Sequence, residues 1–186
     1  MKPRLGIFTR VGAAMVLAGL SLPAFAQMEP TPTLTPTPAS IGADATSLSS
    51  ADKSFLTKAS LGGRKEITVS QAVMANLVDT QVKEFAQQMV TDHTLANNDL
   101  MTLAKQKGFD LPTKDESDLS LDWSKKASDT DRKYVKEMVA DHVDAVHLFE
   151  EASTSSDPDI AAFAQKVLPT LQHHLMMAQD LRKAMD

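Results

Sequence analysis

Residues 89–100 read MVTDHTLANNDL, and residues 138–149 read MVADHVDAVHLF. The two segments have Met, Val, Asp and His at the same positions, 49 residues apart, although the chain has only five histidines. Around both segments apolar residues recur at spacings of three, four and seven, which is the periodicity of an amphipathic α-helix. The repeat therefore predicts two long helices that share a frame and present equivalent faces to one core.

Capping signals mark the first two helices. Ser49-x-x-Asp52 has the form of a capping box, and the apolar positions after it predict a helix at about 50–76. Asp79 can cap a second helix, whose end is predicted at 105–108, where lysines precede a glycine. Both ends of the second helix thus have the expected chemistry.

The second half of the chain contains two more helices. A third long helix is predicted to end near residue 153. Asp157 followed by Pro158 is a strong start signal, because the aspartate caps and proline is favoured in the first turn. This fourth helix should continue to about residue 184, with a kink near its middle at Pro169.

The start of the third helix is open. Ser128 either begins this helix or lies within a longer one that includes residues 114–128. No stretch has the period-two alternation of a strand, and short connections join the helices apart from the region 109–128. We therefore predict an all-α fold, an antiparallel four-helix bundle.

The N-terminus predicts export. Its signals are a basic region (Lys2, Arg4, Arg10), an apolar run (VGAAMVLAGLSL, 11–22) and a small-x-small cleavage motif (Ala24-Phe25-Ala26). These features are typical of a secretory signal peptide at 1–26 that is cleaved near Ala26, which implies a periplasmic or secreted protein. We expect residues 27–48 to be a disordered Pro/Thr-rich linker. It is either a tether that holds the domain off a surface, next to an envelope partner, or a disordered leader without a role. Residues 49–186 form one bundle domain.

Composition excludes several kinds of site. After cleavage the chain would have 16 basic and 24 acidic residues, a net charge of −8, which is unfavourable for nucleic-acid binding. No later stretch is long and apolar enough to span a membrane. Cysteine is absent, so disulfides and thiolate metal sites are excluded. His, Asp, Glu and Met remain as candidate metal ligands.

Helical geometry predicts which polar side chains point inward. At 100° per residue, His93 and His142 lie about 40° from Met89 and Met138 of their own apolar stripes, and His174 lies about 60° from Leu171. The other two histidines, His147 and His173, fall on the opposite side of their helices. Glu66 lies at the centre of the apolar stripe of the first helix, where a charge is costly unless it is paired.

The depth of these residues indicates whether they meet. Depth is counted from the end of the bundle at which we expect both the connection between the first two helices and the connection between the last two. At 1.5 Å per residue, Glu66, His93 and His142 lie roughly 15 to 20 Å from this end, and His174 about one turn deeper. The four side chains therefore fall in one layer or in two adjacent layers.

Three segments resemble a known family. They read VKEFAQQMVTDHTLANNDLMTLAKQKG, YVKEMVADHVDAVHLFEEAS and IAAFAQKVLPTLQHHLMMAQDL, and the likeness covers about residues 51–184. They resemble domain-of-unknown-function family 4142, whose members are commonly labelled predicted outer-membrane or periplasmic proteins and are grouped with the ferritin-like bundles. The resemblance implies a ferritin-like bundle and no established enzyme activity. It places the recurrent residues of the family at Glu66, Asp92, His93, Asp141, His142, Pro169 and His174.

One hypothesis is a mononuclear metal site. Its ligands would be Glu66, His93, His142 and His174, a set that suits copper, zinc or iron. Asp92 and Asp141 would orient imidazoles by accepting their remaining N–H groups. Di-iron chemistry is not expected, because the chain has Asp-His pairs instead of Glu-x-x-His motifs. Five methionines could either supply thioether ligands for copper(I) or pack in the core. They are Met74, Met89, Met138, Met176 and Met177.

The other hypothesis is a hydrogen-bonded polar layer without metal. His93 would pair with Asp141, His142 with Asp92 and His174 with Glu66, and such pairs should raise the pKa values of the histidines. The chain would then be an envelope-associated structural or stress-related interaction module. No nucleophile elbow or phosphate-binding loop is present, so the sequence does not predict an enzyme.

Overall fold

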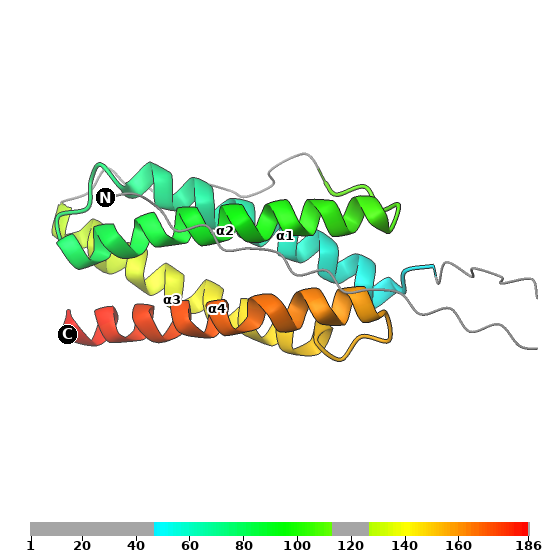
Figure 1. Ribbon diagram of the computed structural model, residues 1–186. Coiled ribbons are helices and arrows are strands. Elements are labelled where there is room, and N and C mark those ends of the chain that lie inside the picture. Colours follow the sequence, from blue (N-terminus) through cyan, green and yellow to red (C-terminus); the bar gives the residue numbers. More distant parts are fainter. Residues whose placement is uncertain (1–46, 113–126, 186) are drawn as a thin grey trace, which may run out of the picture. The chain divides into compact units, whose positions relative to one another are not determined.

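The computed structural model describes residues 47–112 and 127–185. The chain divides into two units, residues 1–42 and 43–186, and every described residue lies in the second. The described helices are α1 (Ser50–Val73), α2 (Thr80–Gln106), α3 (Ala127–Ala152) and α4 (Pro158–Ala184) (Figure 1). The predicted signal peptide, all but the last two residues of the predicted linker, and the region 113–126 lie outside the described residues.

The helix boundaries follow the local capping chemistry. Ser49 and Asp52 form a complete capping box at the start of α1, and Asp79 and Asp157 accept backbone N–H bonds at the starts of α2 and α4. Gly108 follows α2 with a φ of 64°, a left-handed conformation that favours glycine. The predicted starts of α1, α2 and α4 are therefore confirmed.

The end of α1, the start of α3 and the course of α4 add detail to the sequence prediction. α1 ends at Val73 instead of near residue 76, because the chain turns there with backbone bonds from Asn76 and Leu77 to the Val73 carbonyl. Ser128 lies within α3, whose described part begins at Ala127, while the preceding residues that were considered for this helix are not described. α4 runs as one helix through Pro169.

Cross-helix contacts establish the direction of each helix. Asp131, near the start of α3, accepts hydrogen bonds from the backbone N–H groups of Val78 and Asp79 in the α1–α2 connection, at 3.1 and 2.9 Å. Lys107, at the end of α2, contacts the α4 cap Asp157 at 2.7 Å. The α1–α2 and α3–α4 connections therefore lie at opposite ends of the bundle (Figure 1). The expectation that they share one end is wrong.

The packed helices of the bundle are antiparallel. α1 and α4 each pack against α2 and α3, and all four packed pairs are antiparallel. α2 and α3 run in the same direction. The predicted antiparallel four-helix bundle is confirmed.

The core consists of two hydrophobic clusters. One contains Phe55, Leu56, Leu100, Phe149, Phe163 and Leu171 among others, and the second contains Val69, Phe85, Met89, Tyr134 and Met138 among others. Leu48, at the end of the predicted linker, is buried in the first cluster. On every helix, a buried ionisable residue lies between the residues of the two clusters.

Candidate metal centre

The polar layer has one member from each helix. Glu66 on α1, His93 on α2, His142 on α3 and His174 on α4 have exposed fractions of 5%, 7%, 1% and 0%. Measured from the end where α4 terminates, His174 is about 15 Å deep, since ten residues separate it from the end of that helix. His174 therefore lies level with His93 and His142. The prediction that it lies about one turn deeper was wrong, because the α1–α2 and α3–α4 connections are at opposite ends of the bundle.

Three imidazoles meet at the centre of the bundle. The ring centroids of His93, His142 and His174 are 5.4 to 5.5 Å apart. Each residue offers one ring nitrogen such that the three nitrogens lie within 4.8 Å of one another. Nitrogens bound to one tetrahedral cation at about 2.0 to 2.1 Å would lie roughly 3.3 to 3.4 Å apart. The triad is therefore compact enough to hold a metal ion.

Hydrogen bonds orient the ring of His142. Its Nδ1 lies 2.9 Å from the carbonyl oxygen of Met138, which can only accept, so Nδ1 carries the proton. In the neutral ring Nε2 then has a lone pair, which can accept a hydrogen bond from Nε2–H of His93 or bind a cation. This atom faces Nε2 of His93 at 3.4 Å, which is the separation that two ligands of one cation would have.

His174 is oriented by a carboxylate. Its Nε2 donates to Asp92 Oδ2 at 2.9 Å, so the lone pair of the neutral ring is on Nδ1. Nδ1 is completely buried and has no hydrogen-bond partner. A buried polar atom without a partner is costly, and in native proteins such an atom commonly contacts a water molecule or an ion.

Burial keeps the three rings uncharged. Desolvation, together with repulsion from His142 and His174, lowers the pKa of His93 to about 3. Desolvation and the proximity of His174 lower the pKa of His142 to about 4, although its bond to the Met138 carbonyl opposes this. Burial also lowers the pKa of His174 despite its bond to Asp92. At neutral pH no proton competes with a metal for these nitrogens.

Glu66 is buried beside the triad and belongs to a different hydrogen-bonded group. Burial, and the neighbouring charge of Asp141 to which Glu66 also hydrogen-bonds, raise the pKa of Glu66 well above its usual value. Lys65 donates to both oxygens of Asp141 at 2.8 Å and to Glu137 at 2.9 Å. Burial lowers the pKa of Lys65, but these bonds outweigh it and raise the pKa to about 12. Glu66 is not among the ligand atoms that converge within 4.8 Å.

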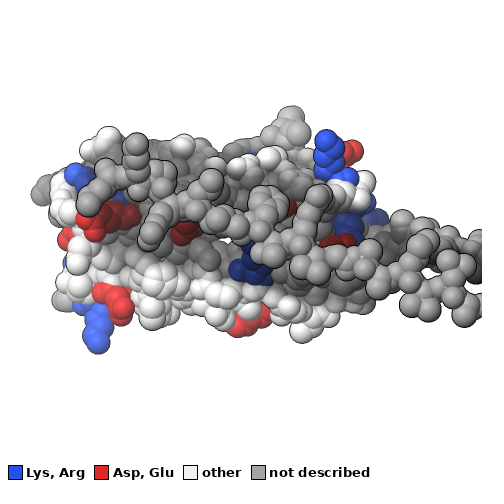
Figure 2. Space-filling view, viewed as in Figure 1, with Lys and Arg blue, Asp and Glu red and all other residues white. Residues whose placement is uncertain are grey.

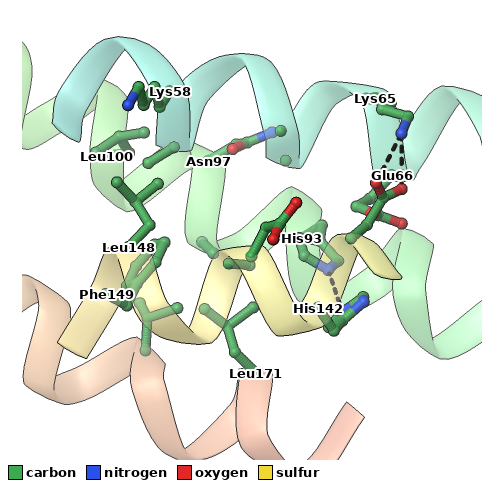
Figure 3. A pocket seen from close by; sticks show the side chains of 18 of the residues that line it. Lys58, Lys65, Glu66, His93, Asn97, Leu100, His142, Leu148, Phe149 and Leu171 are labelled. Atoms are coloured by element: carbon green, nitrogen blue, oxygen red, sulfur yellow. Dashed lines mark hydrogen bonds and ion pairs between the residues drawn. The ribbon is translucent and has the colours of Figure 1, made fainter. Parts of the chain in front are cut away.

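A cavity of about 500 Å³ adjoins the triad. His93, His142 and Glu66 line it together with apolar side chains from all four helices. Figure 3 shows His93 and His142 directed toward each other, with Leu100, Leu148, Phe149 and Leu171 further along the cavity. Exposed residues of α1 and α3, among them Lys58 and Asp144, also line it, so an ion can reach the histidines from solvent.

The pairs proposed for a metal-free layer are not those observed. Asp92 bonds to His174 instead of His142, and Asp141 bonds to Lys65 instead of His93. The pKa values of the buried histidines are lowered, because desolvation of imidazolium outweighs the bonds that these rings make. The expectation of raised values was wrong. His147 and His173 are exposed, as the helical geometry predicted.

Three residues near the site were not predicted from the sequence. Lys65 and Glu137 had no recognised role, because their contact with Asp141 depends on which helices are neighbours. Asn97 lies one turn after His93 and lines the cavity. Its side chain occupies the space beside Gly63, where an added Cβ would lie 2.3 Å from Asn97 Oδ1. A glycine within the apolar stripe of α1 was the available signal.

Together these observations define a helical bundle with a buried three-histidine centre. The chain belongs to the family described as Domain of unknown function (DUF4142), whose model matches residues 37–181. The resemblance seen in the paired MVxDH segments is thereby confirmed. No curated protein matches the chain in sequence.

Two solved structures have similar folds. One is the crystal structure of a DUF305 fragment from Deinococcus radiodurans, with a TM-score of 0.66 and 9% identity, covering 73% of this chain and 97% of that one. The second is a conserved hypothetical protein from Mycobacterium tuberculosis, with a TM-score of 0.57 and 16% identity, covering 74% and 99%. At these identities the likeness supports the four-helix fold alone.

The described residues have a surface of mixed charge on the face drawn in Figure 2. In Figure 2, the visible Lys, Arg, Asp and Glu side chains of the described residues lie in small groups, several of them of mixed sign. None of the helices in the described ranges contains an apolar stretch long enough to cross a membrane.

Proposed function

We propose that this protein binds one transition-metal ion, copper, zinc or iron, through His93, His142 and His174. The observation that carries the proposal is the buried Nδ1 of His174, which has no hydrogen-bond partner and belongs to a ring that lies 5.4 to 5.5 Å from the rings of His93 and His142. A metal ion would satisfy all three nitrogens at once. Neutral imidazole is a suitable ligand for each of these metals.

The other residues that were predicted to bind or orient the metal have different roles. Asp92 holds the ring of His174 by accepting its N–H, as carboxylates commonly do next to metal-bound histidines. Glu66 lines the same cavity as His93 and His142 and is a candidate fourth ligand once it loses its proton. Asp141 supports Glu66 instead of an imidazole. Met89 and Met138 are completely buried in the hydrophobic core, which packing alone explains.

Metal analysis of the purified protein tests this proposal. Wild-type protein should bind about one equivalent of Zn²⁺ or Cu²⁺, and the triple variant H93A/H142A/H174A should bind less than about a tenth as much. The matched control is H147A/H173A, which removes two exposed histidines and should bind like wild type. Circular dichroism verifies that each variant is helical, and the milder H174Q should bind at least tenfold more weakly.

Either of two results would contradict the metal site. One is the absence of stoichiometric binding in wild type, which would favour the metal-free interaction module. The second is equal binding by the triple variant and wild type, which would place the metal on exposed residues.

We further infer that residues 1–26 direct export and that residues 27–48 hold the bundle away from an envelope partner. The basic region, apolar run and Ala24-Phe25-Ala26 motif support this inference. Protein recovered from the producing cells should begin at Gln27, which N-terminal sequencing can establish. A mature protein that retains residues 1–26 would contradict it.

A further inference from the structure

The cavity beside the histidines has a polar inner end and apolar walls. Glu66, Asn97, His93 and His142 contribute polar groups, while Leu100 and Phe149 lie further along it (Figure 3). Its volume of about 500 Å³ falls within the range of small-molecule sites. The cavity can therefore accommodate more than a metal ion.

Small residues on two helices create this space. Ala96 and Ala145 line the cavity and lie seven residues after Met89 and Met138, at equivalent positions of the repeated segments. A larger residue at either position would fill the space between the helices. The cavity is thus a consequence of the same internal repeat that provides two of the histidines.

Two polar atoms of the cavity wall have no hydrogen-bond partner. They are Nδ2 of Asn97 and Oε2 of Glu66, and both are buried. Gly63 allows the Asn97 side chain to lie against α1, one turn before Glu66 on the same helix. An amide N–H group can only donate, whereas the free oxygen of a carboxyl group bonded to Asp141 can accept. Unsatisfied buried groups of both kinds are costly, and a ligand that satisfied them would be stabilised.

We propose that this cavity binds a small uncharged molecule that has an aromatic or apolar body and one hydroxyl group. A hydroxyl group both donates and accepts, so it can bond to Glu66 Oε2 and Asn97 Nδ2 together. The body would lie against the apolar side chains, which include the rings of Phe149 and Phe163.

Charged ligands fit this site less well. The cavity wall contains Lys58 and Lys65 together with Asp141, Asp144 and Glu151, so neither sign of charge predominates. The ammonium of Lys65 is already engaged by Asp141 and Glu137. A carboxylate at the inner end would approach two acidic side chains, and an ammonium group would leave the Asn97 N–H unsatisfied.

The experiment compares three ligands of similar shape: phenol, toluene and benzoate. Binding is measured by calorimetry or ligand-observed NMR on metal-stripped protein, so that the result is independent of the metal site. Phenol should bind about tenfold more tightly than toluene, which corresponds to one net hydrogen bond, and at least tenfold more tightly than benzoate.

Variants locate the binding. N97L removes the donor at similar size and should abolish the preference for phenol over toluene, whereas N98L, one position along on the exposed side of α2, should keep it. A145F fills the cavity and should eliminate the binding of both ligands, and the control A162F, at an exposed position of α4, should bind normally.

Three outcomes would overturn the proposal. They are equal binding of phenol and toluene by wild type, an unchanged preference in folded N97L, and no binding of either ligand, which would mean that the cavity holds water only. The comparison of the three ligands on wild type remains decisive if a variant fails to fold.

Discussion

Between pH 7 and about pH 4.5, the free energy of unfolding of metal-free E66Q should fall by on the order of 5 kcal/mol because of His93 and His142 alone. Their folded pKa values are about 3 and about 4, below the usual 6.5 that the unfolded chain has. The unfolded state therefore binds more protons in this range. Their contribution to stability is complete above pH 6.5 and is lost as the pH falls toward the folded values.

The substitution at Glu66 is needed because this residue acts in the opposite direction. Its folded pKa is raised, so the protonated folded state gains stability as the pH falls to about 4.5. Wild type should consequently lose less stability than E66Q over the same range. Urea unfolding at several pH values measures both effects.

The control for this prediction removes the titrating rings. The variant E66Q/H93Q/H142Q retains the surface carboxylates, so its pH dependence reports their share. Between pH 7 and about pH 4.5, the free energy of unfolding of E66Q should fall by on the order of 5 kcal/mol more than that of this variant. Equal slopes in the two proteins would mean that His93 and His142 titrate normally, and therefore that they are not desolvated as the structure shows.

The parts of the fold that could be predicted from sequence depend on local interactions. Asp79, Asp157 and Gly108 act on backbone groups within a few residues, so the sequence pattern contains the whole interaction. The relative direction of α2 and α3 was not predictable in this way. It depends on contacts such as that of Asp131 with Val78, which join distant segments of the chain.

The same distinction holds for the candidate site. Helical periodicity was sufficient to identify His93, His142 and His174 as inward, because it requires only the apolar stripe of each helix. It placed Asp92 and Asp141 about 60° to one side of their stripes, but it could not show which helix each would meet. Asp92 lies toward α4 and Asp141 toward α1, and that knowledge requires the packing order of the bundle.

Metal binding should stabilise the folded protein strongly. At a Zn²⁺ concentration about a thousandfold above Kd, the free energy of unfolding should rise by about 4 kcal/mol, and Tm by roughly 10 °C. The three neutral nitrogens exist as a compact set only in the folded state, which is why the ion would favour that state. Scanning calorimetry with and without Zn²⁺ measures the shift, and no shift in wild type would argue against the site.

Asp92→Ala should remove part of this stabilisation, because His174 loses the carboxylate that fixes its ring and its free Nδ1. Loss of such a partner typically weakens metal affinity tenfold to a hundredfold, so the gain with Zn²⁺ should fall by roughly 1 to 3 kcal/mol. Asp99→Ala is the matched control, since Asp99 lies two turns further along α2 and pairs with Lys166 on the exposed surface. If Asp92→Ala and Asp99→Ala respond equally to Zn²⁺, His174 is not a ligand oriented by Asp92, and the ion is held elsewhere.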